Sequence, residues 1–184
     1  MFSLESLDRI TGEGGRIAIH PSNVKQDWYV MAMTQWPLPE PMTLALAEAQ
    51  AGALADEVPV GAVVVHHGKV IAMAHNAPRK NHDPTAHAEI LALRAAAQVL
   101  GNERLGDCDL WVTLEPCAMC AGAIAHARIA RLYYGASDAK GGAVEHGARV
   151  FDQAQTLHKP EVYAGIGAEQ AAGILRVFFK DRRD

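Results

Sequence analysis

Short β-branched or aromatic runs alternate with Ala- and Leu-rich segments along most of the chain. The former are typical of strands and the latter of helices. The expected elements, in chain order, are a helix at 42–55, two strands within 58–75, a helix at 87–100, a strand at 109–114, a helix at 116–126, strands at 129–135 and 161–166, and a helix at 168–182. This order predicts a sheet between helices, with parallel pairing wherever a helix intervenes.

Turn and capping residues support these boundaries. His67-Gly68 lies between two apolar runs, which indicates a tight hairpin. Gly101 is placed to end the 87–100 helix, and Pro116 suits the first turn of the next one, where its missing N–H costs nothing. Thr43 is a candidate N-cap for the first helix.

The chain has room for one compact domain, at 184 residues with 49% hydrophobic side chains. No apolar run approaches the roughly 18 residues of a membrane helix, and no basic-then-apolar leader is present. Three cysteines cannot form a disulfide framework, which favours a reducing compartment. We therefore expect a cytoplasmic protein without a membrane partner. The net charge of −4 neither supports nor excludes RNA, since local clustering decides phosphate binding.

Residues 1–41 are rich in proline and glycine and show no sustained period. We expect a poorly ordered extension there, followed by one domain over 42–184. A leader, a cloning remnant, a start codon assigned too early (with Met31 or Met33 the true start) and a functional arm remain alternatives.

Two short segments carry the chemistry, His87-Ala88-Glu89 and, 27 residues later, Pro116-Cys117-Ala118-Met119-Cys120. Both lie at predicted helix N-termini, where the helix dipole lowers the pKa of a thiol. Cys117 and Cys120 are three residues apart, so they share a helix face and can bind one ion. With His87 they make three protein ligands. Structural zinc is almost always closed by four, whereas catalytic zinc keeps its fourth position for water.

The sequence leaves two alternatives to a three-ligand site. Cys108 could be a fourth ligand, although an ordinary semi-buried thiol at the far end from Cys117 is expected. A bare Cys-x-x-Cys could also be a redox pair, but a dithiol couple needs neither the histidine nor the glutamate.

Glu89 is the candidate proton carrier. A carboxylate beside a zinc-bound water can take its proton. The alternative is a solvated first-turn glutamate that complements the helix dipole. Its position two residues from a metal ligand favours the catalytic interpretation.

The pattern His-x-Glu…Pro-Cys-x-x-Cys is the signature of zinc deaminases. Over essentially all of 42–184 the chain resembles the bacterial tRNA-specific adenosine deaminases. The matching stretches are EVPVGAVVV (57–65), Asn76 with DPTAHAEI (83–90), TLEPCAMCAGAIAHARI (113–129), YGASDAKGGA (134–143) and FFKDRR (178–183). Residues 144–160 depart from the commoner sequence of the family, and the last helix ends earlier than in some relatives.

The resemblance implies a three-layer α/β/α cytidine-deaminase-like fold with a mixed five-stranded sheet. It also implies hydrolytic deamination of the wobble adenosine of a tRNA anticodon loop to inosine, with one Zn²⁺ per subunit on His87, Cys117 and Cys120. By similarity, Glu89 moves a proton from the metal-bound water to N1, hydroxide attacks C6, and ammonia leaves.

Further residues are assigned to the substrate by the same resemblance. Asn76 would bond the base edge with help from the Ala88 N–H, although asparagine is also common in turns. The remaining pocket residues are Val58, Pro59, Leu114 and Asp138, the last beside the nucleic-acid backbone. Basic candidates for binding RNA are Arg79, Lys80, His82, Arg128, Lys140, Arg149, Lys180, Arg182 and Arg183, of which Lys140 and Arg182 are taken as substrate residues. Phe179 is the candidate for a flanking base, although the sequence does not distinguish it from Phe178.

Relatives are homodimers that meet at the small-residue helix after Cys120, so a homodimer is expected, with simple core packing of that helix as the alternative. Two other functions stay open. A deaminase of a free base or nucleotide, of the guanine or cytidine type, would share the zinc site but not need FFKDRR or the DPTAHAE loop. A non-catalytic zinc-stabilised RNA-binding module would have no use for Glu89.

Overall fold

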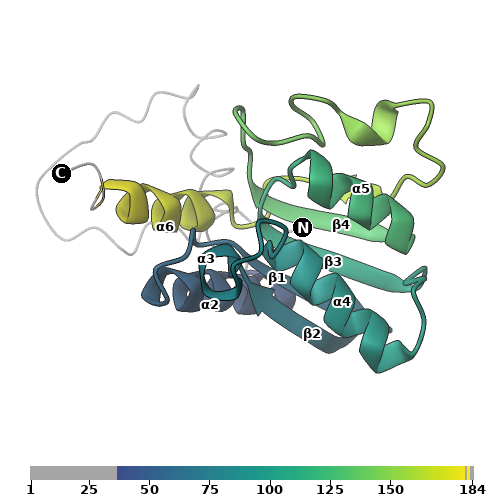
Figure 1. The fold of residues 1–184 in the computed structure, drawn as a ribbon, viewed down its shortest axis with the longest axis horizontal. Coiled ribbons are helices and arrows are strands. Elements are labelled where there is room, and N and C mark those ends of the chain that lie inside the picture. Colours follow the sequence, from purple (N-terminus) through teal and green to yellow (C-terminus); the bar gives the residue numbers. More distant parts are fainter. Residues whose placement is uncertain (1–36, 181, 183–184) are drawn as a thin grey trace, which may run out of the picture. The chain divides into compact units, whose positions relative to one another are not determined.

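The fold is built on a five-stranded sheet with the spatial order β2-β1-β3-β4-β5 (Figure 1), seen in a computed structural model that describes residues 37–180 and 182. The strands are β1 (Gly61–His66), β2 (Lys69–His75), β3 (Cys108–Leu114), β4 (Arg131–Ala136) and β5 (Glu161–Tyr163). β1 pairs antiparallel with β2 and β3, whereas β4 pairs parallel with β3 and β5. The predicted mixed sheet of five strands is therefore confirmed.

Helices cover both faces of this sheet (Figure 1). They are α2 (Glu40–Leu54), α3 (Pro78–Asn81), α4 (Ala88–Leu100), α5 (Ala118–Ala127) and α6 (Ala168–Lys180), with a 3-10 turn, η2 (Val150–Asp152). Val64 packs into the core under α4 and α5, while its neighbour Val63 packs into the core under α2 and α6. Successive strand side chains point to opposite faces, so a strand buried on both faces is apolar at every position. The three-layer α/β/α arrangement is thus confirmed.

The connections between strands place two helix N-termini at one edge of the sheet. α5 joins β3 to its neighbour β4, and these strands are parallel, as predicted. α4 joins β2 to β3, which do not pair because β1 lies between them. The expectation of parallel pairing across every helix is therefore wrong for α4.

The start of α2 differs from the sequence-based expectation. The helix begins at Glu40, with Pro39 at the N-cap position, and Thr43 lies inside it with its hydroxyl 3.4 Å from the Pro39 carbonyl oxygen. Proline fits this entry because its fixed φ suits a helix start and first-turn N–H groups have no helical partner. Thr43 is therefore not the N-cap. The predicted extension otherwise lies outside the described residues.

The other turns follow their glycines. His67 and Gly68 both have positive φ, 49° and 76°, and form the predicted hairpin turn. β5 ends at Tyr163, before the predicted residue 166, because Gly165 and Gly167 (φ 84° and 71°) turn the chain into α6. None of the described helices is long and apolar enough to cross a membrane.

Gly61 lets β1 approach the backbone of α2 closely. A Cβ at this position would lie 2.0 Å from the Ala45 carbonyl oxygen and 2.6 Å from the Ala49 nitrogen. Because both are backbone atoms of one helix, we expect Gly61→Ala to lower the free energy of unfolding by about 3 kcal/mol. Gly106→Ala is the matched control, since its nearest atom would lie 3.9 Å away. Urea titrations that give equal midpoints for the two variants would contradict this explanation.

Candidate active site

His87, Cys117 and Cys120 converge where α4 and α5 begin. His87 occupies the N-cap position of α4 and Cys117 that of α5, so both motifs lie at helix N-termini as predicted. Pro116, predicted in the first turn of the second helix, instead lies before its N-cap. The Nδ1 atom of His87 lies 3.7 Å from Cys117 Sγ and 3.6 Å from Cys120 Sγ. Ligand atoms held tetrahedrally by one zinc ion are about 3.6 Å apart, given Zn–N and Zn–S bonds of about 2.0–2.3 Å. The donor set and its spacing therefore fit a zinc ion.

Within the described residues the cluster consists of these three side chains. Both its cysteines are free thiols. Cys108 lies at the first residue of β3, fully buried at the other end of that strand. It does not complete the cluster. Three protein ligands leave a coordination position for water, which is the pattern of catalytic zinc.

The charge state of Cys117 also suits a cation, whereas its hydrogen bond with Cys120 raises the pKa of the latter. Hydrogen bonds from Cys120 and His87 lower the pKa of Cys117 to about 4. The hydrogen bond to Cys117 in turn raises the pKa of His87. A thiolate, not a thiol, is the metal ligand. Cys117 therefore presents the required form at neutral pH.

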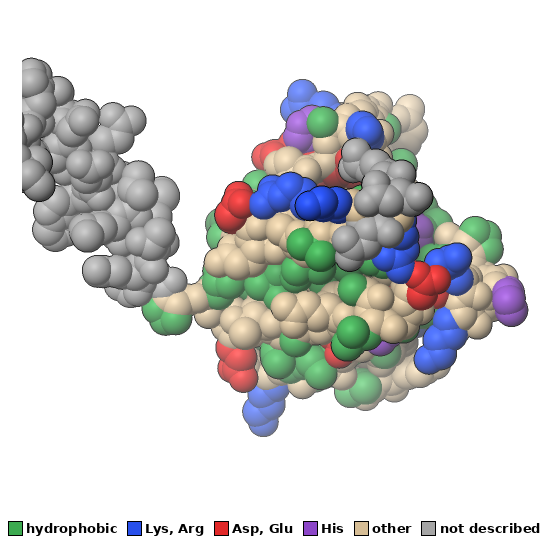
Figure 2. Space-filling view, turned by 90° about the vertical axis from the view of Figure 1, so that its left-hand side faces the viewer, with side chains coloured by type: hydrophobic (Ala, Val, Ile, Leu, Met, Phe, Trp, Pro, Cys, Tyr) green, Lys and Arg blue, Asp and Glu red, His purple; other side chains and the backbone are tan. Residues whose placement is uncertain are grey.

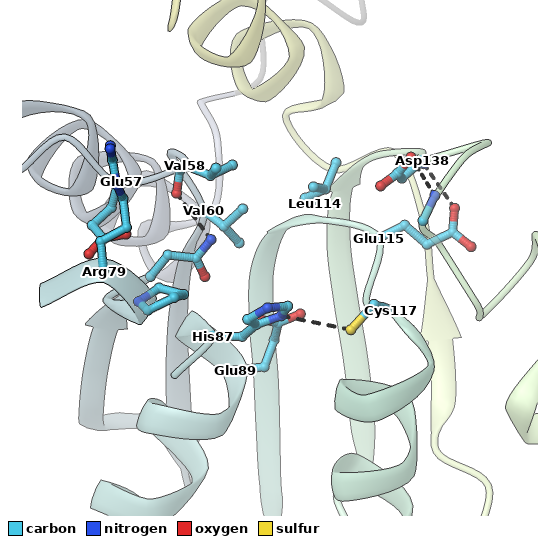
Figure 3. A pocket seen from close by; sticks show the side chains of 13 residues that line it. Glu57, Val58, Val60, Arg79, His87, Glu89, Leu114, Glu115, Cys117 and Asp138 are labelled. Carbon is cyan, nitrogen blue, oxygen red and sulfur yellow. Dashed lines mark hydrogen bonds between the residues drawn. The ribbon is translucent and has the colours of Figure 1, made fainter. Parts of the chain in front are cut away.

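Glu89 lies in the first turn of α4 with only 4% of its surface exposed. Figure 3 shows its carboxylate beside the His87 ring and near Cys117. Burial raises the pKa of Glu89. A solvated glutamate that only complements the helix dipole would be exposed, and this one is not. A buried carboxylate beside the cluster can receive a proton and pass it on.

A cavity of about 360 Å³ opens onto the cluster. Its lining includes His87, Glu89 and Cys117 together with four predicted substrate residues, which are Asn76, Val58, Leu114 and Asp138 (Figure 3). Val58 and Leu114 supply apolar walls. Ligand pockets of this kind combine apolar walls with a few placed polar groups.

Asn76 ties two sides of the cavity together. Its Nδ2 donates to the Val58 carbonyl oxygen (3.1 Å) and its Oδ1 accepts from the Ala88 N–H (2.8 Å). These two partners fix which end of the amide faces which way. One N–H and one lone pair of the amide stay free of these bonds. The Ala88 N–H, assigned to the base by the resemblance, is bound to Asn76 here.

The other predicted substrate residues lie outside the cavity lining. Pro59 is buried, and its neighbour Val60 lines the cavity in its place. Lys140 is exposed, and its N–H donates to Asp138 Oδ1 at 3.0 Å. Phe179 is 41% exposed whereas Phe178 is 7% exposed, which decides which of the two packs in the core.

Two predicted basic contacts, Arg79 and Arg182, are joined by Asp56. Arg79 donates to the Asp56 carboxylate and, at 2.9 Å, to its backbone oxygen, while Arg182 donates to the other carboxylate oxygen. The Arg182 guanidinium also lies 3.6 Å from the centroid of the Phe178 ring. On the face in Figure 2, Lys and Arg side chains surround hydrophobic ones. Arg183 lies outside the described residues.

Sequence reasoning missed Glu115, which organises the loop beside the cavity. Its carboxylate accepts backbone hydrogen bonds from Asp138 (3.0 Å), Val144 (3.1 Å), Glu145 (2.9 Å) and His146 (3.0 Å), and it lies 2.7 Å from His146 Nδ1. Burial alone would raise the pKa of Glu115, but these hydrogen bonds hold it at about 2. The only sequence signal was an acidic residue between a buried strand and Pro116.

We expect Glu115→Ala to destabilise the protein by roughly 3 kcal/mol or more, because it leaves several buried N–H groups without an acceptor. Hydrogen exchange at 138–146 should accelerate, and the midpoint of thermal unfolding should fall. Glu103→Ala, at a side chain 83% exposed, serves as the control and should leave both unchanged. Unaltered exchange in Glu115→Ala would contradict the role given to this carboxylate.

Glu57, also missed, is the third buried glutamate of the lining, with Glu89 and Glu115, and it anchors α3. It is 2% exposed and accepts a hydrogen bond of 2.8 Å from the Lys80 N–H. α3 itself was not predicted, because four residues are too few for a periodic pattern.

Comparisons with known proteins agree with this site. The family model of MafB19-like deaminases matches residues 39–183. A tRNA-specific adenosine deaminase of Agrobacterium fabrum is 56% identical over 142 residues, which cover 77% of this chain and 93% of the relative. A solved structure from work on A-to-I editing by tRNA:A34 deaminases at the wobble position of transfer RNA is 56% identical, with a TM-score of 0.73 over 73% of this chain and 98% of that one.

A guanine deaminase from Bacillus subtilis is a more distant structural neighbour. It is 33% identical, with a TM-score of 0.53 over 78% of this chain and 91% of that one. The match to the family model and the identity to the Agrobacterium relative place the chain clearly. It belongs to the MafB19-like deaminase family, as one of the bacterial tRNA-specific adenosine deaminases.

Proposed function

We propose that the chain hydrolytically deaminates the wobble adenosine of a tRNA anticodon loop to inosine, with one Zn²⁺ per subunit on His87, Cys117 and Cys120. The observation that carries this proposal is the convergence of that cluster with buried Glu89 on one cavity. The 56% identity to a tRNA-specific adenosine deaminase supports the substrate.

The residues of the cavity have distinct tasks in this reaction. Zinc on the three ligands would supply Lewis-acid activation of water. Glu89 accepts a proton from the attacking water and delivers it to N1 of the purine. It then carries a second proton, from the hydroxyl group formed at C6, to the departing amine, which leaves as ammonia. Its burial keeps bulk water from competing for that proton.

The purine base is held by the apolar walls of the cavity and by the side-chain amide of Asn76. Val58 and Leu114 present apolar surface to the purine, and the free N–H and free oxygen lone pair of the Asn76 amide face its polar edge. Because Asn76 is already oriented by Val58 and Ala88, it needs no rearrangement to bind. The cavity, at about 360 Å³, lies within the range of small-molecule sites.

The wobble base must leave its stack to enter this cavity. Anticodon-loop bases are single-stranded, so the cost of extrusion is low. Arg79, which lines the cavity, and Arg182, joined to it through Asp56, are the basic groups proposed to meet the RNA backbone. A tRNA substrate and free ligand thiols both suit the reducing cytoplasm, to which we assign the reaction.

An assay with competing substrates tests the proposal. Zinc-loaded enzyme is given an anticodon stem-loop with adenosine at the wobble position, the same stem-loop with adenosine moved by one position, and free adenine, guanine and cytidine. We expect inosine only from the wobble adenosine. Ammonia released only from free guanine would overturn the tRNA assignment in favour of the activity named for the 33%-identical neighbour.

A homodimer through α5 is also proposed. A Cβ built at Gly122 meets no atom of the described residues within 4 Å, its chain neighbours and the nearby backbone of α5 aside, so this side of the helix has room for a partner. Small residues permit close approach of a second helix. Light scattering should give twice the chain mass, and Gly122→Glu should give the monomer with an unchanged circular dichroism spectrum. A monomeric wild type would contradict the proposal.

A further inference from the structure

The β1–β2 hairpin carries a second cluster of metal-binding side chains. His66, His67 and Asp107 each offer a ligand atom, and these atoms all lie within 4.8 Å of one another. The six-residue length of β1 separates this cluster from Val60, which lines the catalytic cavity, by roughly 17 Å or more. We propose that these three side chains form a second metal site, for a borderline divalent ion such as Zn²⁺ or Cu²⁺.

Strand register brings the three side chains together. His66 is the last residue of β1 and pairs with Cys108 of β3, so Asp107, the residue before Cys108, lies at the same end of the sheet. The positive φ of His67 in the hairpin turn brings its ring to 4.0 Å from the His66 ring, centroid to centroid. Histidine is among the residues that adopt this backbone conformation more readily.

Backbone hydrogen bonds hold the loop that carries Asp107. The Cys108 N–H donates to the Leu105 carbonyl oxygen at 3.0 Å, and the Leu105 N–H donates to the Ala127 carbonyl oxygen at 2.6 Å. Leu105 and Cys108 are buried. The ligand atoms are thus close together in the folded chain before any ion binds, which lowers the ordering cost of binding.

Charges of both signs lie near the cluster. Asp107 and the neighbouring Asp109 are acidic, whereas Lys69 pairs with His66 across the hairpin and Arg104 lines the same cavity as His66 and Asp107. Arg104 lies 3.6 Å from Glu103 and Arg131 lies 2.7 Å from Asp109, so both arginines have acidic partners. Burial, together with the charges of Asp107 and Asp109, raises the pKa of Cys108 to about 11. Cys108 is fully buried and is not one of the three side chains that offer a ligand atom to this cluster.

The donor set selects the class of ion. Imidazole nitrogen suits Zn²⁺, Cu²⁺ and Ni²⁺, whereas Mg²⁺ and Ca²⁺ prefer oxygen alone. A cavity of about 210 Å³ lies beside His66 and Asp107 and has room for water ligands. His67 and Asp107 are exposed, so the site can exchange its ion with solvent more readily than the buried cluster can.

The test compares metal content between variants of untagged, zinc-loaded enzyme. Equilibrium dialysis against Zn²⁺ at pH 8 should give one more ion per chain in the wild type than in the His66→Gln/His67→Gln double variant. Asp107→Asn should weaken the binding of the extra ion at least tenfold. Cu²⁺ added to zinc-loaded wild type should give an electron paramagnetic resonance signal with nitrogen coupling, and the double variant should lack it.

His126→Gln, at another exposed histidine, is the control and should keep the extra ion. Deamination should be unchanged in the double variant, which separates this site from the catalytic one. Equal zinc content in wild type and double variant would overturn the proposal, and so would loss of the extra ion from His126→Gln. Because the test compares the zinc content of two variants with the same catalytic cluster, its result does not depend on what that cluster binds.

Discussion

Glu89→Gln should lower kcat for deamination by at least about a thousandfold, the range expected for loss of a positioned acid–base group. Glutamine keeps the size of the side chain but cannot accept and return a proton. The cluster of His87, Cys117 and Cys120 should keep its zinc ion, because Glu89 is not among the three ligand residues. The stem-loop assay and metal analysis of the same preparation provide the two measurements.

Glu57→Gln is the matched control, since Glu57 also lines the cavity but anchors α3 and carries no proton. Its oxygen can still accept the hydrogen bond from the Lys80 N–H, so activity should stay within about tenfold of wild type. If Glu89→Gln also stays within tenfold, the assigned proton carrier is wrong. If it loses zinc together with activity, Glu89 acts through the metal ligands.

Cys117→Ala should lose both the metal and the activity. Only two ligand residues remain in this variant. Metal binding is also coupled to folding, because without the ion the remaining ligands no longer hold α4 to α5. We expect less than about a tenth of an ion per subunit at the His87, Cys117 and Cys120 cluster. The midpoint of thermal unfolding should fall by roughly 5–10 °C, as a loss of about 2–3 kcal/mol implies for a domain of this size.

Cys108→Ala controls for loss of a buried thiol. It removes a fully buried side chain far from the cluster, so it should cost stability while keeping zinc and activity. Circular dichroism establishes whether Cys117→Ala remains folded. A folded Cys117→Ala protein with a full zinc content would show that the ligand set is wrong.

Features with local causes were predictable from the sequence. His87 and Cys117 were expected at helix starts because short motifs and a proline mark those positions, and the structure places both at N-caps. The hairpin turn at His67-Gly68 follows in the same way from two adjacent residues. Such signals act over a few residues, so one sequence carries them.

Features with distant causes were not predictable. Glu115 gains its role from N–H groups 23 to 31 residues further along the chain, and no local pattern announces them. The failed parallel pairing across α4 has the same origin, because β1 enters between β2 and β3 from earlier in the chain. Thr43 is not the N-cap because the helix already begins at Glu40, directly after Pro39.

The two hydrogen bonds made by the Asn76 side-chain amide have a consequence for redesign of base selectivity. One oxygen and one nitrogen couple the Val58 wall to Ala88, the residue after a metal ligand. Enlarging the side chain at Val58 would therefore also displace the first residues of α4. Phe179 belongs to α6, on the opposite layer, so exchanges there leave the ligands undisturbed.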